Sequence, residues 1–479
     1  MRFKSIVLYS LILLFSTKIF SQKIISIDEI LEKIIFETDE YNNVQKNNII
    51  FNDEYNIVNN IFLPKVSLEI NAPNYDHSIN VITQPNGDNF FLDRKQANSS
   101  TAIDIMQPIY FTGGYFNIKS SINRVDLLNS KNVNYSSNWF NIGFVQPLNG
   151  FNQFKWIKKV NDIKYKSNKI NILKEIEDLK LKVIEKYFDV LILQLKIKLT
   201  SKNIDLKTRK INNLKELLKS GRVLDIDIIQ EDISINQLKI SLKQQANQFQ
   251  IEVEEFKNIL NLNNSDLIFE EPINFKFEEF NMQLLKEKIK EFGIDVYFEA
   301  NLVEAESELV KAKRERGIQA NLQLAYGANS ANNLLDGLFE TPSKREFVNL
   351  NIKIPILNWN ENKRRMNIAY NKKEILENNM KIASEELDLK VFQTINYIES
   401  LNDQKNLYEL NIGLINKNIE IATNLYEFNR VTLTDYDNQI FNELVTKVDF
   451  LSNKKESWLS RFRLRKLTLY DFYLKKSLL

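Results

Sequence analysis

One long stretch of the chain, from Phe151 to Ser220, contains no glycine or proline and constrains the fold more than any other feature. Within it, apolar residues recur at the three-four spacing of a helix face: Ile176, Leu179, Val183, Tyr187 and Val190. A helix of about 65 residues is roughly 100 Å long at 1.5 Å per residue. Such a helix is too long for a compact globular domain and needs helical neighbours along its whole length.

A second helix follows the first after a short break. The break is predicted at Ser220-Gly221-Arg222-Val223, and the next helix runs from about Asp227 to Asn261. Helix therefore occupies most of residues 151–261. The second half of the chain predicts the same pair over residues 360–475, with a break at Asn429-Arg430.

Two segments have the period of two that is typical of strands. They cover residues 64–150 and 317–357; in the first, Val66, Leu68 and Ile70 alternate with polar residues. An apolar file opposite a polar one fits strands between lipid and an aqueous lumen, and it fits a soluble sheet about equally well. Four to six strands cannot close a membrane barrel alone, because single-chain barrels start at about eight. Copies of a membrane-embedded chain must therefore associate.

The chain is predicted to be an internal duplication, with a first repeat over residues 22–272 and a second over 273–479. Pro147 and Pro355 are 208 residues apart, as are Arg222 and Arg430. Asp227 and Asp435 keep the same offset. The first strands, in contrast, are 256 residues apart, so the first β segment is longer by 48 residues. This excess predicts either an added hairpin or a long external loop.

The first residues have the pattern of a secretory signal. Two positive charges in Met1-Arg2-Phe3-Lys4 precede an apolar run from Ile6 to Phe15, and we predict a signal peptide over residues 1–21. No later apolar stretch is long enough to span a membrane as a helix, so any membrane passage would use strands. The 64 basic and 62 acidic residues are spread along the chain and form no patch for nucleic acid.

The breaks between the long helices carry a resemblance to a known family. Gly221-Arg222-Val223-Leu224-Asp225-Ile226-Asp227 and Tyr426-Glu427-Phe428-Asn429-Arg430-Val431-Thr432-Leu433-Thr434-Asp435 resemble the two periplasmic tip turns of the TolC family of efflux and secretion ducts. Gln146-Pro147-Leu148 and Ile354-Pro355-Ile356 resemble its strand-to-helix junctions. The resemblance covers about residues 24–472. It implies a mainly α fold with a β-barrel part: a homotrimer whose outer-membrane barrel has 12 or more strands on a long α-helical periplasmic tunnel.

The resemblance also implies partners and site residues. The tips would meet a periplasmic adaptor (membrane fusion) protein and an inner-membrane transporter, while the barrel contacts outer-membrane lipid. The docking residues would be Gly221, Arg222, Val223, Asn429, Arg430 and Val431, and the pore aperture would involve Asp435 and Asn438. Two residues depart from the family pattern. Asn429 stands where a glycine is usual, and Asn438 where a second acidic residue is usual, so an aperture ring would carry fewer charges.

The leading function is therefore a passive outer-membrane channel, with small-molecule efflux and polypeptide secretion both left open. No enzyme, cofactor or metal is expected, because His77 is the sole histidine and the chain has no cysteine. A non-channel periplasmic or surface coiled-coil binding protein is the alternative. It leaves the 208-residue duplication unexplained.

Overall fold

The computed structural model describes residues 23–85, 87–262, 267–273, 283–285, 287–288, 295–428 and 430–479. The predicted signal peptide and Asn429 lie outside the described residues. The chain divides into two compact units, which are Met1–Asn48, Lys169–Gly293 and Glu385–Leu479 for the first, and Ile49–Asn168 and Ile294–Ser384 for the second. Each unit therefore takes residues from both predicted repeats.

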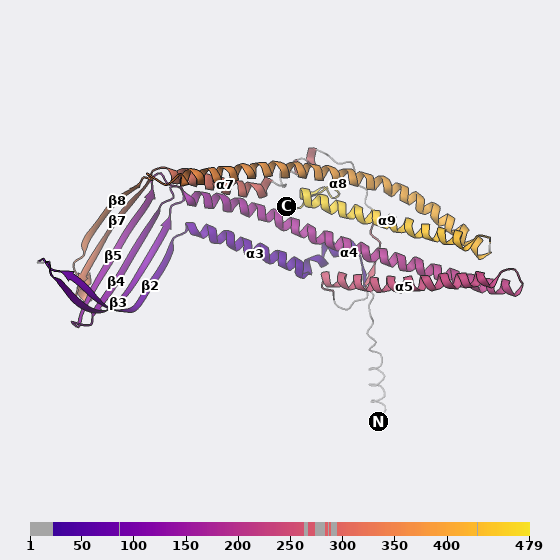
Figure 1. Cartoon of the computed structure of the whole chain (residues 1–479), viewed down its shortest axis with the longest axis horizontal. Helices are drawn as coiled ribbons and strands as arrows, with labels where there is room; N and C mark the ends of the chain where they lie inside the picture. The colour runs from indigo at the N-terminus through magenta and orange to yellow at the C-terminus, as the bar shows by residue number, and fades with distance from the viewer. Residues whose placement is uncertain are drawn as a thin grey trace, which may run out of the picture. The chain divides into compact units, whose positions relative to one another are not determined.

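The four long helices lie within the ranges that the sequence predicts, residues 151–261 and 360–475. They are α4 (Gln153–Lys219), α5 (Asp225–Ile259), α8 (Glu361–Glu427) and α9 (Leu433–Thr468), drawn in Figure 1. Helices α4 and α8 have 67 residues each. The first residues of α4 and α8 are 208 positions apart, and so are those of α5 and α9. The structure thus shows the same offset that the proline and arginine landmarks have in the sequence.

The first unit has its apolar core around Tyr187 of α4. Strand β1 (Lys23–Ile25) pairs in parallel with β6 (Leu267–Phe269), and both strands contribute to this core. The fully buried Tyr187 hydroxyl lies 3.0 Å from the carbonyl oxygen of Ile25 and 2.6 Å from that of Glu270, and it donates its single proton to this pair. Two short helices, α2 (Ile27–Glu32) and η1 (Ile34–Glu37), lead into α3 (Asp39–Asn59). Burying these large apolar side chains together stabilises the packing of α4 against α5, α9 and the two short strands.

Helix α9 ends at Thr468, before the predicted limit of residue 475, and this corrects the sequence expectation. Leu469 takes a left-handed conformation (φ 50°), and its N–H donates to the carbonyl of Arg465 at 2.7 Å. A turn follows in which β9 (Tyr470–Asp471) pairs antiparallel with β10 (Lys476–Ser477). The apolar periodicity does not reveal this end, because the turn is held by polar side-chain contacts to α9 itself and, through Arg465, to α4.

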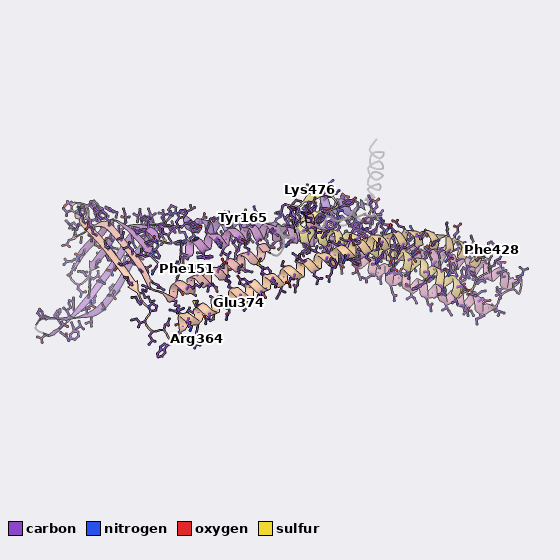
Figure 2. The ribbon with its side chains drawn as sticks, turned by 90° about the horizontal axis from the view of Figure 1, so that it is seen from above. Phe151, Tyr165, Arg364, Glu374, Phe428 and Lys476 are labelled. Atoms are coloured by element: carbon purple, nitrogen blue, oxygen red, sulfur yellow. The ribbon has the colours of Figure 1, made fainter. Side chains whose placement is uncertain are left out.

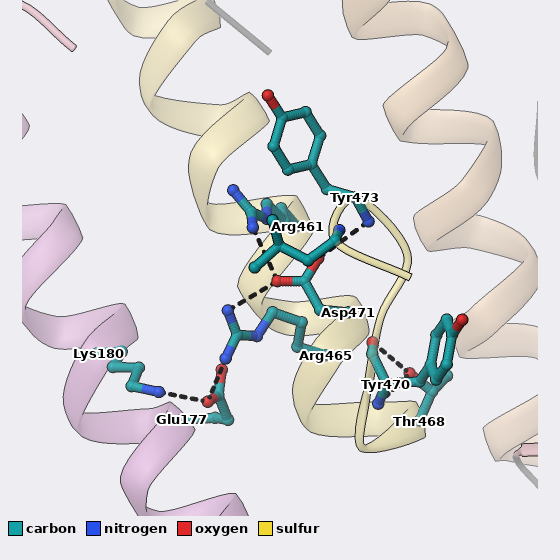
Figure 3. A network of polar contacts seen from close by, with 9 residues as sticks. Glu177, Lys180, Arg461, Arg465, Thr468, Tyr470, Asp471 and Tyr473 are labelled. Atoms are coloured by element: carbon teal, nitrogen blue, oxygen red, sulfur yellow. Dashed lines mark hydrogen bonds and ion pairs between the residues drawn. The ribbon is translucent and has the colours of Figure 1, made fainter. Parts of the chain in front are cut away.

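Asp471 is the main anchor of that turn (Figure 3). Its carboxylate accepts hydrogen bonds from Arg461 at 2.7 Å and Arg465 at 2.9 Å, and Arg465 also reaches Glu177 of α4 at 3.0 Å. Lys180 is the last member of this series of ion pairs and lies 2.8 Å from Glu177. Burial alone would raise the pKa of Asp471, but the hydrogen bonds and positive charge of the two arginines lower it below its usual value. The network joins the C-terminal turn to α4.

The second unit contains one antiparallel sheet of six strands, in the order β2-β3-β4-β5-β7-β8 (Figure 1). The strands are β2 (Lys65–Thr83), β3 (Asn89–Pro108), β4 (Tyr115–Leu127), β5 (Asn132–Pro147), β7 (Gln319–Asn332) and β8 (Ser343–Lys353). Strands β4 and β5 of the first repeat occupy the places that β7 and β8 have in the second. The hairpin of β2 and β3 is thus the extra segment, and of the two alternatives the added hairpin is confirmed.

The remaining elements of this unit are short or helical. They are η2 (Asn60–Phe62), α7 (Asp295–Arg316) and η3 (Asp336–Phe339). The indole N–H of Trp139 on β5 donates to the carbonyl of Leu338 at 2.9 Å, which fixes η3 against the sheet. Within the described parts of the chain, no helix is both long and apolar enough to cross a membrane.

Candidate functional site at the helix tips

The first tip turn connects α4 to α5 and has a conformation that requires glycine. Gly221 has φ +69°, a left-handed value that only glycine adopts without cost. Its N–H donates to the carbonyl of Leu218 at 2.9 Å, and the Arg222 N–H donates to that of Leu217 at 3.1 Å. These two bonds form a Schellman motif, which satisfies the last carbonyls of α4. Arg222 is exposed and Val223 is half-buried.

The second tip turn connects α8 to α9 and repeats one of these bonds. The Arg430 N–H donates to the carbonyl of Leu425 at 2.8 Å, 208 residues after the bond between Arg222 and Leu217. Asn429, the predicted substitute for glycine, lies outside the described residues. Phe428 is 76% exposed at the end of α8 (Figure 2), whereas Val431 packs against a buried cluster described below. Arg222, Arg430 and Phe428 are therefore open to a partner, whereas Val223 and Val431 are half-buried.

The two tip aspartates stabilise the starts of the return helices. Asp227 accepts a hydrogen bond from the N–H of Leu224 at 3.0 Å. Asp435 accepts one from the hydroxyl of Thr432 at 2.6 Å, and its own N–H donates back to that hydroxyl oxygen at 3.1 Å. Acidic residues are favoured in a first helical turn because they lie near unsatisfied N–H groups and the positive end of the helix dipole. Asp435 and Asn438 are both exposed, and their aperture role remains a prediction.

A buried polar cluster lies directly behind the two turns, and we call it the four-helix cluster because α4, α5, α8 and α9 all contribute to it. It consists of Lys207, Lys210, Glu231, Tyr426, Tyr436 and Asp437. Five of its members are 4% exposed or less, and Asp437 is half-buried. Leu206 of α4 and Ala422 of α8 complete the buried packing around the two tyrosines.

Lys207 provides the charge at the centre of the cluster. Its Nζ atom lies 2.6 Å from a carboxylate oxygen of Asp437 and 3.4 Å from one of Glu231. The other oxygen of Glu231 accepts a hydrogen bond from the Tyr426 hydroxyl. One lysine of α4 is thereby linked to carboxylates of α5 and α9, and through Glu231 to α8.

The two tyrosine rings and Lys210 form the second half of the cluster. Tyr426 and Tyr436 stack with their centroids 3.8 Å apart and their planes inclined by 3°. The Lys210 ammonium lies 3.5 Å from the centroid of Tyr426 and donates to the backbone carbonyl of the same residue at 2.8 Å. A cation over an aromatic face is attracted by the quadrupole of the ring. This contact holds the last turn of α8 against α4.

Burial changes the acidity of several of these groups. It lowers the pKa of the Lys210 ammonium and raises the pKa of Tyr436 to about 12. Burial also raises the pKa of Tyr426, and the hydrogen bond to Glu231 raises it further. At neutral pH both tyrosines are therefore neutral, and the Tyr426 hydroxyl can donate to the carboxylate.

The arrangement makes separation of the two hairpins costly. A buried ion pair that loses one partner leaves an uncompensated charge, at a cost of about 3–5 kcal/mol. Any movement of α9 away from α4 separates Asp437 from Lys207, and movement of α8 away from α5 breaks the contact between Tyr426 and Glu231. The cluster can thus act as a latch between the repeats. Sequence reasoning missed it, because its lysines and acids look like the many other charged residues on these helices.

The described residues offer no arrangement for a metal ion. Within them, no group of three or more His, Cys, Asp or Glu side chains is placed to hold one. The acidic residues of the four-helix cluster are instead paired with lysine or tyrosine.

Comparison with solved structures finds the same fold in outer-membrane channels. CusC, in a study of transmembrane channel formation, matches with a TM-score of 0.64 and 13% identity over 92% of this chain and 91% of that one. The CmeC outer-membrane channel of Campylobacter jejuni matches with a TM-score of 0.63 and 14% identity over 92% and 85%. The outer-membrane protein VceC of Vibrio cholerae matches with a TM-score of 0.63 and 9% identity over 93% and 95%.

These matches cover 92% to 93% of the chain, and the resemblance to the TolC family is confirmed at the level of the fold. By sequence alone, no protein-family model and no curated protein matches the chain.

Proposed function

We propose that the chain is the subunit of a trimeric outer-membrane exit duct. The observation that carries this proposal is the agreement of fold with solved outer-membrane channels over more than nine-tenths of the chain. The duct would be passive: a partner pump drives small molecules or polypeptides through it. The sheet would lie in the outer membrane, and the four long helices would extend into the periplasm.

The two tip turns are the proposed docking surface for a periplasmic adaptor protein, which would connect the duct to an inner-membrane transporter. They present two exposed arginines, Arg222 and Arg430, beside exposed apolar side chains. Leu224 is 69% exposed, and Phe428 is 76% exposed. Exposed apolar side chains rimmed by charge are typical of protein interaction sites. Gly221, Val223, Asn429 and Val431 would shape the two turns.

The tips are also the proposed gate. Asp435 and Asn438 would face the aperture, where one carboxylate per subunit gives a ring of low negative charge. The four-helix cluster supports this proposal, because it joins the two hairpins of one subunit through a buried ion pair. Opening would then require the hairpins to move apart and Lys207 to lose a carboxylate partner.

The first test is the oligomeric mass of the protein extracted from outer membrane in mild detergent. Light scattering with the detergent contribution subtracted should give about three times the mass of the mature chain. The same preparation should conduct ions when it is inserted into planar bilayers. A monomer that stays soluble without detergent would contradict the proposal and favour the coiled-coil binding protein.

A further inference from the structure

The register of the sheet places apolar side chains on one face across the added hairpin and its neighbours. Val66 of β2 lies opposite Ile105 of β3, which lies opposite Ile118 of β4 and, through it, Ile142 of β5. The row continues to Tyr326 of β7 and ends at the charged Glu346 of β8. Side chains alternate between the faces of a strand, so residues paired in register share a face. The added hairpin therefore extends the apolar face of the other four strands.

The opposite face is polar along the same direction. The row next to the apolar one runs from Ser67 through Asp104 and Lys119 to Asn141. It ends at Gly327 and Arg345. If the hairpin lay outside a barrel wall formed by the other four strands, it would not be expected to continue both their apolar and their polar face. The hairpin thus has the pattern of wall strands between lipid and water.

The strands are also staggered as in a tilted wall. Lys65, the first residue of β2, lies opposite Met106, two residues before the end of β3 at Pro108. The strand ends are offset by the same two residues, in the same direction, between β4 and β5 and between β5 and β7. Between β3 and β4 and between β7 and β8 the strand ends are level. The offset is averaged over all the pairings of the sheet, with about 3.3 Å per residue and about 4.8 Å between strands. It corresponds to strands tilted by roughly 40° from the axis of a barrel. Membrane barrels have tilts of about 35–45°.

Both outer strands of the sheet have a free edge. Within the described residues, β2 pairs only with β3 and β8 only with β7. Long free edges expose unpaired N–H and C=O groups, which would be very costly in lipid. The sheet is antiparallel with an even number of strands, so β2 and β8 run in opposite directions. When copies are related by rotation, β8 of one copy meets β2 of the next in antiparallel orientation.

We propose that β2 and β8 form the seam between copies, and that all six strands of each copy belong to the barrel wall. This inference rests on the proposed trimeric channel. Three copies with six strands each then give a barrel of 18 strands, where the family resemblance implied 12 or more. The apolar file of β2, with Val66 at 68% exposure, continues that of β8, with Val348 at 76%.

The seam has a consequence for transport. Barrel diameter grows about linearly with strand number, so the lumen at the sheet is about half as wide again as in a 12-strand barrel. Barrels of 16–18 strands leave an aqueous channel. The helix tips, and not the sheet, would then limit the size of the substrate.

The seam can be tested by cysteine crosslinking, because the chain has no cysteine of its own. Ser67→Cys on β2 is combined with Asn351→Cys on β8, which face each other if the seam has no step. A second pair, Ser67→Cys with Lys353→Cys, covers a two-residue step in the direction seen elsewhere in the sheet. A third pair, Asn117→Cys with Asn351→Cys, reports a 12-strand wall in which β4 is the edge. All four positions lie on the polar face.

The pairs are oxidised in the native outer membrane and separated on denaturing gels without reductant. We expect one of the two Ser67 pairs to convert most chains into crosslinked trimers, and the Asn117 pair to remain uncrosslinked. Crosslinking only through Asn117 would overturn the 18-strand seam and leave the trimeric channel intact. So would a trimer by light scattering in which no pair reacts. A monomer that reacts at no pair would overturn the channel itself.

Discussion

The Nζ atom of Lys207 lies 2.6 Å from Oδ1 of Asp437, although the two residues belong to different repeats. Lys207 is fully buried, and Glu231 is its second carboxylate partner. This contact makes each hairpin depend on the other, because neither repeat contains the whole cluster. Stability of the tips and opening of the proposed gate are therefore expected to respond to the same substitutions.

Lys207→Met is expected to lower the stability of the helix tips by about 3–5 kcal/mol, because it leaves Glu231 and Asp437 without their buried cation. Hydrogen exchange of α5 and α9 near the turns should become faster, and channel conductance should rise. The control is Lys219→Met. Its ion pair with Glu216 joins side chains that are 71% and 72% exposed, so its loss should change little. Equal exchange in the two variants would contradict the latch.

Tyr426→Phe is expected to destabilise the tips by about 1.5–3 kcal/mol, the usual effect of losing a hydrogen bond to a charged group. The ring and its stacking on Tyr436 remain, so the hydroxyl is tested alone. Tyr408→Phe removes a hydroxyl from the same helix outside the cluster and serves as the control. Limited proteolysis at the second turn should distinguish them. The idea fails if both variants are cut at the wild-type rate.

Replacing glycine by alanine is expected to have opposite effects at two sites. At Gly221 the left-handed backbone disfavours a Cβ atom, so Gly221→Ala should destabilise the turn by about 1 kcal/mol. Gly413 lies inside α8 with nothing within 4 Å of the added Cβ atom. Gly413→Ala should therefore stabilise that helix by about 0.5–1 kcal/mol. The thermal unfolding midpoints of the two variants, measured in the same detergent, should shift in opposite directions from that of the wild type. Shifts in the same direction would contradict the prediction.

The network around Asp471 predicts an acid-sensitive C-terminal turn. The pKa of Asp471 is lowered in the fold, so its contribution is complete above its unfolded pKa, about 3.9. The contribution is lost as the pH falls through the lowered value. Asp471→Asn should be less stable than wild type near neutral pH, because Arg461 and Arg465 then lose the buried Asp471 carboxylate and Arg465 keeps only Glu177.

The difference between wild type and Asp471→Asn should shrink as the solution becomes more acidic than the folded pKa. Thermal unfolding midpoints measured from about pH 6 to about pH 2 would show this convergence. Asp178→Asn is the control, since Asp178 is 51% exposed in its ion pair with Lys466. A gap between Asp471→Asn and wild type that stays constant with pH would contradict the assignment.

The helical part of the fold follows from local sequence. Helices α4 and α8 begin and end where glycine, proline and the three-four apolar spacing predict, because helix formation depends on residues within a few turns. The turn at Gly221 could also be predicted, since glycine is the default residue for a left-handed helix end. The docking and aperture roles of residues 221–223, 429–431, 435 and 438 came from family resemblance, and they remain predictions.

Tertiary structure decided the rest. The alternating pattern from Val66 to Ile70 indicates a strand, but it does not say which strand pairs with it. Only the six-strand register showed that the 48 extra residues are a hairpin in the same sheet. The early end of α9 at Thr468 depends on the contact of Asp471 with Arg465, which is itself held by Glu177 of the distant helix α4. The four-helix cluster is the clearest case: a lysine and an aspartate 230 positions apart have no local signal for each other, and only packing brings Lys207 and Asp437 together.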